Sequence, residues 1–177
     1  MTLFVIALPE EARHVPDGIR LCITGPGKLR SGIAVARALV EKPEDLVVNI
    51  GTAGALRDGL HSGAHRIGRV FEHDFDAAAI EALTGRHYDD TITLGEGLAL
   101  ATGDAFIASA AKRAALAEHA DLVDMEGFAI AHAARTFGAR CQMFKVVTDS
   151  ADEGAWSWAE TVGAAAKEIG RLVSELR

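Results

Sequence analysis

The stretch Phe144-Lys145-Val146-Val147-Thr148-Asp149-Ser150-Ala151-Asp152 decides the predicted fold and site of this chain. Its apolar, β-prone part ends at Val147 and predicts a strand, and Asp149 follows just past the strand end. A second stretch, Val123-Asp124-Met125-Glu126-Gly127, puts Glu126 where a short apolar run gives way to an Ala-rich helical segment. In open α/β sheets, ligands bind beyond the carboxyl ends of strands. Two carboxylates delivered to one such edge therefore predict a functional site, and cleavage of a glycosidic bond commonly uses two carboxylates.

Outward from these two stretches, apolar runs alternate with helical segments along the whole chain. The expected strands are 3–8, 19–24, 46–50, 65–71, 91–94, 98–102, 122–123 and 141–148, and the expected helices are 28–40, 74–83, 109–119, 125–136 and 160–176. The helix at 28–40 is predicted from the spacing of Leu29, Ile33, Ala36 and Val40. This alternation predicts βα units and a largely parallel sheet in an α/β fold, organised as a single domain over 1–177.

Two glycine-containing segments follow predicted strands. Gly25-Pro26-Gly27-Lys28 lacks the third glycine of a dinucleotide motif and the hydroxyl residue of a P-loop, so it predicts a tight turn into a helix. The N–H groups of that turn could still bind an anion. Gly51-Thr52-Ala53-Gly54 is expected to be a loop whose small residues let a ligand approach the backbone. The alternative is an ordinary turn that needs a glycine with positive φ.

The composition excludes several classes of function. The 177 residues are 49% hydrophobic and carry a net charge of −7, without a basic cluster, so no nucleic-acid partner is expected. The start, Met1 to Leu8, has neither a basic leader region nor the length of a membrane span, which favours the cytoplasm and no membrane partner. Cys22 and Cys141 lie in apolar runs and are expected to be buried free thiols. No residues have the spacing of a metal site, and neither a metal nor a cofactor is expected.

Six motifs in order give the chain a resemblance to a known family. They are Ala7-Leu8-Pro9-Glu10-Glu11, Gly25-Pro26-Gly27-Lys28, Asn49-Ile50-Gly51-Thr52-Ala53-Gly54, Thr102-Gly103-Asp104-Ala105-Phe106-Ile107, Asp124-Met125-Glu126-Gly127-Phe128-Ala129-Ile130-Ala131 and Thr148-Asp149-Ser150-Ala151-Asp152. Each motif is weak alone, but together they resemble the nucleoside phosphorylase superfamily over almost the whole chain. The resemblance is to its nucleosidase branch, typified by the 5′-methylthioadenosine/S-adenosylhomocysteine nucleosidases. It implies a three-layer domain with a mixed, largely parallel central sheet flanked by helices, and a homodimer.

The resemblance also implies catalytic roles for two carboxylates. Asp149 corresponds to the general acid that protonates the leaving purine at N7, and Glu11 to the base that orients or deprotonates the attacking water. A carboxylic acid with a raised pKa can protonate a leaving base near neutral pH. The implied substrate is therefore a purine nucleoside or a 5′-modified relative, cleaved at its N-glycosidic bond.

The remaining implied roles concern substrate binding. Glu126, with Met125 beside it, corresponds to the residue that binds the ribose 2′- and 3′-hydroxyls. Phe106 corresponds to the aromatic residue that stacks on the base, and the backbone of Ile107 reads the base edge. The remaining two predicted substrate-binding residues, Thr52 and Gly54, belong to the small-residue segment beside the attacking nucleophile.

One function, hydrolysis, is favoured, and two alternatives remain. Phosphorylases of the superfamily carry an arginine where this chain has Asn49, and the carboxylates of Glu10 and Glu11 would repel phosphate, so hydrolysis is favoured over phosphorolysis. A phosphorylase is the first alternative. A catalytically silent nucleoside-binding protein is the second, although binding alone would not need an acid at the leaving group.

The chain also departs from the family. Its first helix is reduced to a turn, the segment 71–98 is short, and Leu8 replaces a methionine of the pocket. We therefore expect the purine and ribose end of the pocket to follow the family more closely than the 5′ end. Trp156 and Trp158 either supply apolar surface to the pocket or pack under the last helix.

Overall fold

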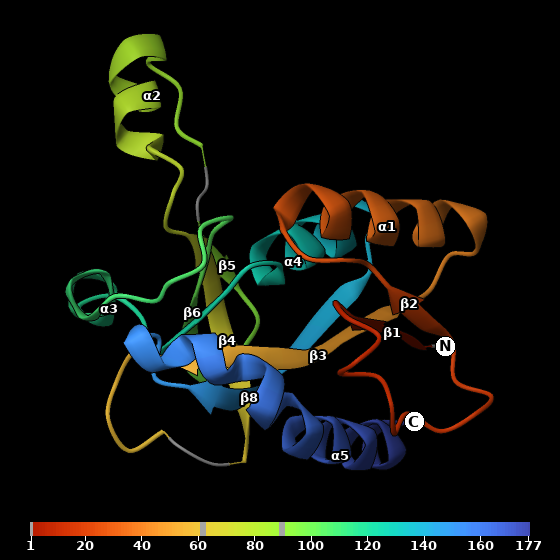
Figure 1. Ribbon diagram of the computed structural model, residues 1–177. Helices are drawn as coiled ribbons and strands as arrows, with labels where there is room; N and C mark the ends of the chain where they lie inside the picture. The colour runs from red at the N-terminus through yellow and green to blue at the C-terminus, as the bar shows by residue number, and fades with distance from the viewer. Residues whose placement is uncertain (1, 61–62, 89–90) are drawn as a thin grey trace.

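A single sheet of eight strands forms the centre of the computed structural model, which describes residues 2–60, 63–88 and 91–177 (Figure 1). The elements in chain order are β1 (Thr2–Ile6), β2 (Leu21–Ile23), α1 (Lys28–Glu41), β3 (Leu46–Ala55), β4 (Ala64–Glu72), α2 (Ala77–Thr84), β5 (Thr91–Thr93), β6 (Leu98–Thr102), α3 (Ala110–Ala117), β7 (Leu122–Asp124), α4 (Gly127–Thr136), β8 (Arg140–Asp149), the 3₁₀ turn η1 (Glu153–Ser157) and α5 (Trp158–Leu176). The alternation of strands and helices predicted from the sequence is confirmed.

The sheet is mixed and partly closed on itself. Five strand pairs are parallel, whereas β3·β7, β4·β5 and β4·β8 are antiparallel. The strand order is β2-β1-β3-β7-β6-β4-β5, and β8 pairs with both β3 and β4. The strands β3, β7, β6, β4 and β8 therefore form a ring. Strand direction reverses between β3 and β7, so the site is not built at the edge of a purely parallel sheet.

Helices cover the two faces of the sheet and give three layers (Figure 1). Successive residues of β1 alternate between the faces, as the period of two of a strand requires. Leu3 and Val5 pack in one cluster with residues of α1 and α4, while Phe4 and Ile6 pack in another with residues of α5. Burial on both faces explains why the strand reads as a continuous apolar run.

The residues that predicted α1 are not the residues that α1 buries. The helix buries Ser31, Val35 and Leu39. By contrast, Leu29 is 74% exposed, and Val40 is 67% exposed. Both sets have helical spacing, so periodicity predicts the helix but cannot decide which of two apolar faces packs inward. Ser31 tolerates burial because its hydroxyl donates to main-chain carbonyls one turn earlier.

One predicted loop is in fact a strand. Gly51-Thr52-Ala53-Gly54 lies inside β3 and pairs in parallel with β8, with a register shift after Ala53. Neither Gly51 nor Gly54 has a positive φ, so the turn interpretation is also wrong. Gly54 is needed for space. A Cβ atom at position 54 would lie 2.9 Å from a carboxylate oxygen of Asp149.

Smaller differences occur at element ends. The helix predicted from residue 125 begins at Gly127, and Glu126 occupies its N-cap position. Asp149 is the last residue of β8 rather than the residue after it. Helix α2 has no buried residue and projects away from the body at the upper left of Figure 1. Over the described residues, none of the helices combines the length and the apolarity needed to cross a bilayer.

Candidate active site

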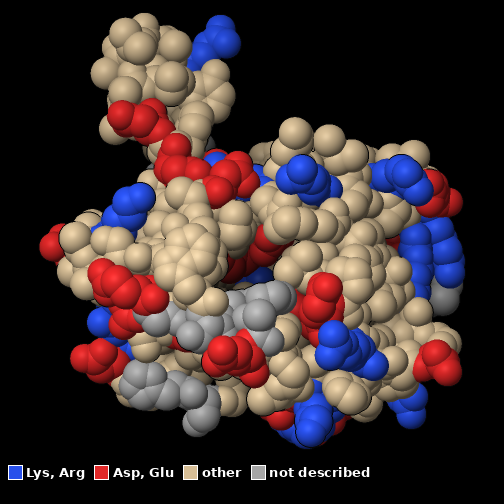
Figure 2. Space-filling model, in the orientation of Figure 1, with Lys and Arg blue, Asp and Glu red and all other residues tan. Residues whose placement is uncertain are grey.

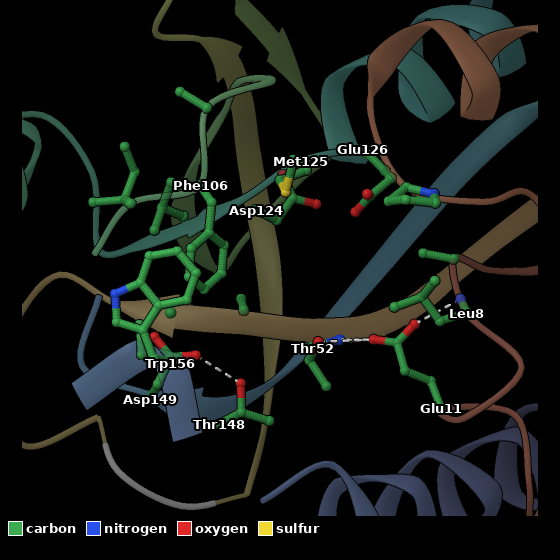
Figure 3. A pocket seen from close by; sticks show the side chains of 18 residues that line it. Leu8, Glu11, Thr52, Phe106, Asp124, Met125, Glu126, Thr148, Asp149 and Trp156 are labelled. Carbon is green, nitrogen blue, oxygen red and sulfur yellow. Dashed lines mark hydrogen bonds between the residues drawn. The ribbon is translucent and has the colours of Figure 1, made fainter. Parts of the chain in front are cut away.

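All eight predicted site residues line one cavity of about 390 Å³ (Figure 3). The predicted residues are Glu11, Thr52, Gly54, Phe106, Ile107, Met125, Glu126 and Asp149. They come from the segments after β1 and β6, from β3, from the β7–α4 junction and from the end of β8. Figure 2 shows acidic side chains deep in the recess at the centre of this face. The cavity lies over the part of β3 where neighbouring strands run in opposite directions.

The carboxylate of Glu11 is held by three donors. The Leu8 N–H donates to Oε2 at 3.0 Å, and Thr52 donates to Oε1 through its N–H at 2.7 Å and through its hydroxyl at 2.8 Å. The side chain is only 2% exposed. An ionised carboxylate has about four lone-pair sites, so one acceptor site remains. That site can accept a hydrogen bond from a water molecule in the cavity.

The carboxylate of Glu126 closes the opposite wall of the cavity. The Gly27 N–H donates to Oε1 at 2.8 Å, and the residue is 7% exposed. Burial and the nearby charge of Asp124 raise its pKa to about 7, while Lys145 and the Gly27 N–H act in the opposite direction. The glycine turn before α1 therefore binds a carboxylate of the protein itself. The next N–H of this turn, from Lys28, donates to Asp104.

Beneath Glu126 lies a buried ion pair that the sequence reasoning did not identify. The Lys145 Nζ lies 2.8 Å from Oδ2 of Asp124, and the two side chains are 2% and 1% exposed. Asp124 also accepts hydrogen bonds from the Thr102 hydroxyl at 2.6 Å and from the Gly127 N–H at 2.8 Å. Burial disfavours the ammonium, but the surrounding carboxylates outweigh burial and raise the pKa of Lys145. The available signal was a lone lysine inside an apolar strand.

The carboxylate of Asp149 lies at the other end of the cavity and is only half-buried. The Ala151 N–H donates to Oδ1 and the Thr148 hydroxyl donates to Oδ2, each at 2.9 Å. Ala151 has φ 52°, the single positive φ outside glycine among the described residues. This strained backbone turns the chain directly after β8 so that its N–H reaches the carboxylate.

Two aromatic rings stand beside Asp149 (Figure 3). The ring centroids of Phe106 and Trp156 are 5.3 Å apart, and the ring planes meet at 55°. Phe106 is 43% exposed and Trp156 is 76% exposed, so both keep apolar surface available to a ligand. Trp156 therefore contributes to the pocket, which was one of the two interpretations of its sequence position. The side chain of Trp158 lies outside the described residues.

Comparison with known proteins places the chain in a family. A sequence model described as the phosphorylase superfamily matches residues 65–176, more than half of the chain. The chain belongs to this superfamily. The predicted family and fold class are therefore confirmed.

Two curated relatives belong to the nucleosidase branch. The chain is 27% identical to the 5′-methylthioadenosine/S-adenosylhomocysteine nucleosidase of Staphylococcus carnosus, with 88% of this chain and 79% of the relative covered. It is 29% identical to the nucleosidase of the same name from Actinobacillus succinogenes, with 85% of this chain and 76% of the relative covered.

Solved structures share the fold at lower sequence identity. The Helicobacter pylori 5′-methylthioadenosine/S-adenosylhomocysteine nucleosidase superposes with a TM-score of 0.87 at 20% identity, covering 99% of this chain and 96% of that chain. The futalosine hydrolase of the same organism gives a TM-score of 0.87 at 19% identity, with 99% and 96% covered.

Proposed function

We propose that this protein is an N-ribosyl hydrolase that cleaves the N-glycosidic bond of an adenosine-type nucleoside, such as 5′-methylthioadenosine, S-adenosylhomocysteine or a futalosine-like compound. The observation that carries the proposal is the charge of the cavity. Glu11, Asp124, Glu126 and Asp149 line it, and no lysine, arginine or histidine lines it within the described residues. A phosphate nucleophile would be repelled by this lining, whereas water would not. The curated relatives, which are named nucleosidases, support the same reaction.

In the proposed mechanism, Asp149 protonates the leaving base. N-glycosidic cleavage leaves negative charge on the base and positive charge on the ribose ring, so a proton delivered to the base removes the first of these charges. Among the described residues, Asp149 accepts hydrogen bonds from Ala151 and Thr148, which leaves a position on the carboxyl group free to carry the proton that it delivers to the base. Phe106 stacks on the base, and the Ile107 backbone reads its edge.

The buried end of the cavity acts on the ribose and the water. Glu126 accepts hydrogen bonds from the 2′- and 3′-hydroxyls beside Met125. The remaining acceptor site of Glu11 orients the water, and Thr52 holds that carboxylate in place. The carboxylates together favour the positive charge that develops on the ribose, because they are already oriented and excluded from solvent.

The experiment that tests the proposal is a nucleoside panel assayed with and without phosphate. Adenosine, 5′-methylthioadenosine and S-adenosylhomocysteine are incubated with the protein, and products are separated by chromatography. The expected products are free adenine and a free ribose moiety, formed at the same rate with and without phosphate. Ribose 1-phosphate as product, or absolute dependence on phosphate, would establish a phosphorylase instead.

The 5′ specificity is expected to differ from that of longer relatives. None of the described residues between 71 and 98 lines the cavity, so the described part of this segment does not close the 5′ end within one chain. We expect weak discrimination between plain adenosine and its 5′-thioethers. A strong preference for thioethers in the same panel would contradict this expectation.

We further propose that the protein acts as a homodimer in the cytoplasm. The outer face of α1 exposes Leu29, Ile33 and Val40, and the projecting arm around α2 exposes Leu83 to 82%. Both lie on one side of the body, where a second copy seated under the arm would cover them (Figure 1). Light scattering of the protein and of Ile33→Glu should give a dimer and a monomer, respectively. The free thiols Cys22 and Cys141 are typical of a reducing compartment, which cell fractionation can test.

A further inference from the structure

Lys145 is the one fully buried lysine of the described chain, and it lies under the floor of the cavity without lining it. It sits in the middle of β8, on a strand that the helices cover on both faces. Its ammonium contacts Asp124 at 2.8 Å rather than solvent. Transfer of an ion from water to the protein interior costs several kcal/mol, even after the surrounding structure has relaxed. A charged lysine at this position therefore requires carboxylates nearby that offset this cost.

The groups that face Lys145 come from three other segments. Asp124 ends β7, Glu126 caps α4, and Glu11 follows β1; all three act on Lys145 by charge. A Cβ atom added at Gly51 would lie 3.5 Å from Oε1 of Glu11 and 3.6 Å from Nζ of Lys145, which places both groups around the same glycine. On β8 itself, burial raises the pKa of Cys141 to about 12, so this thiol stays neutral. One ammonium therefore balances three carboxylates.

The two carboxylates that act most strongly on Lys145 by charge are not equally supported. Asp124 keeps two donors besides Lys145, the Thr102 hydroxyl and the Gly127 N–H. Glu126 accepts from the Gly27 N–H. Hydrogen bonds to an ionised carboxylate favour its charged form. If the charge of Lys145 were lost, the proton taken up in compensation would therefore go to Glu126.

We infer that Lys145 is a positioning residue which, through its ion pair with Asp124, keeps Glu126 ionised and able to accept hydrogen bonds from two ribose hydroxyls. The part that concerns ribose rests on the proposed function. The part that concerns ionisation does not, because it follows from the ion pair of Lys145 with Asp124 and from the hydrogen bond that ties Asp124 to Gly127, the residue after Glu126. A protonated Glu126 would become a donor at one oxygen and would lose an acceptor for the hydroxyls.

The test is a pH titration of protein labelled with ¹³C at the glutamate carboxyl groups, followed by NMR. The Glu126 signal is assigned by its loss in Glu126→Gln. In Lys145→Met the titration midpoint of this signal should rise by about one pH unit or more. The reason is that a close positive charge lowers the pKa of a carboxyl group by at least about this amount. In Asp124→Asn the midpoint should fall, because Lys145 then acts on Glu126 without opposition. In the double variant Asp124→Asn/Lys145→Met it should return close to the wild-type value.

The activity of the same variants provides a second readout. A rise of one pH unit from about 7 leaves about one-tenth of Glu126 ionised at pH 7 instead of half, so KM in Lys145→Met should rise about fivefold at pH 7. The effect should largely disappear at pH 9. Lys28→Met is the matched control, because Lys28 likewise forms ion pairs, with Glu72 and Asp74, but these lie outside the cavity lining.

Two results would overturn the inference. One is an unchanged Glu126 midpoint in Lys145→Met, or in Asp124→Asn if the first variant does not fold. The other is a double variant that stays shifted as far as Lys145→Met, which would indicate a packing role. If the wild-type protein cleaves no nucleoside, the proposed function fails, whereas the NMR midpoints still decide the role of Lys145.

Discussion

The two ends of the cavity are built differently. At one end, Glu11, Glu126 and the pair Asp124–Lys145 are buried and held by main-chain donors and by one another. At the other end, Asp149 is half-buried beside two exposed aromatic rings. The difference matches the two kinds of work in N-glycosidic cleavage. Charge stabilisation needs fixed, dry carboxylates, whereas proton transfer needs a carboxyl group that can exchange its proton with solvent between turnovers.

The largest expected effect is at the exposed end. Asp149→Asn keeps the shape of the side chain but cannot deliver a proton, so turnover should fall about 10²–10⁴-fold, or roughly 3–5 kcal/mol in barrier, while substrate binding changes little. Steady-state and single-turnover kinetics with the best nucleoside measure both quantities. The loss should shrink for a nitrophenyl riboside, whose leaving group needs no protonation. Near-normal turnover of Asp149→Asn on a purine nucleoside would show that Asp149 only positions its neighbours.

The next effect lies at the buried end. Glu126→Gln removes a charged acceptor for two hydroxyls, so kcat/KM for ribosides should fall roughly 10–150-fold. This corresponds to a loss of about 1.5–3 kcal/mol in transition-state stabilisation. The loss should be smaller for 2′-deoxyribosides, which already lack one hydroxyl. Equal losses for the two sugar series would exclude this role.

The same substitution has a stability consequence with a defined sign. Folding raises the pKa of Glu126 from 4.5 to about 7, so the folded state binds this proton more tightly than the unfolded state does. Glu126 therefore lowers the free energy of unfolding as pH rises from about 4.5 to about 7. Thermal unfolding should show that Glu126→Gln gains stability relative to the wild type over this interval. A constant difference in Tm from pH 5 to pH 8 would contradict the raised pKa.

A pair of glycine substitutions in β3 compares the two ends directly. In Gly54→Ala the new Cβ would lie 2.9 Å from the Asp149 carboxylate and 3.0 Å from Ala151, so Asp149 must shift and turnover should fall roughly tenfold. Gly51→Ala is the matched control, because its Cβ would meet Glu11 and Lys145 at ordinary contact distances of 3.5 and 3.6 Å. Similar activities of the two variants would show that close approach to Asp149 is not what position 54 requires.

The smallest expected effect concerns the support of Glu11. Thr52→Val keeps the shape and the main-chain N–H but removes the hydroxyl that donates to Oε1 at 2.8 Å. A net loss of about 0.5–1.5 kcal/mol is expected, or roughly 2–10-fold in kcat with little change in KM. Thr148→Val removes the corresponding hydroxyl at the Asp149 end. The ratio of the two losses measures which end of the cavity depends more on its hydroxyl.

Local sequence signals predicted which carboxylates form the site, but not the strand pairing that brings them together. Asp149 and Glu126 were predictable because each follows an apolar strand run, and a short segment of chain fixes that position. Their convergence was expected from a parallel sheet, yet β7 runs antiparallel to β3 and the strands close into a ring. The pairing of strands far apart in sequence depends on packing of the whole sheet, which no single motif encodes.

The sequence by itself determined the alternation of strands and helices, the family and eight of the residues that line the cavity, because these depend on hydrophobic period and on ordered local motifs. Only the tertiary structure decided that Gly51 and Gly54 lie in a strand, where Gly54 leaves space for the Asp149 carboxylate of a neighbouring strand. It also decided which face of α1 is buried. Above all, it placed Lys145 against Asp124, because the partner of a buried charge is chosen by distance in the folded chain and not by distance along it.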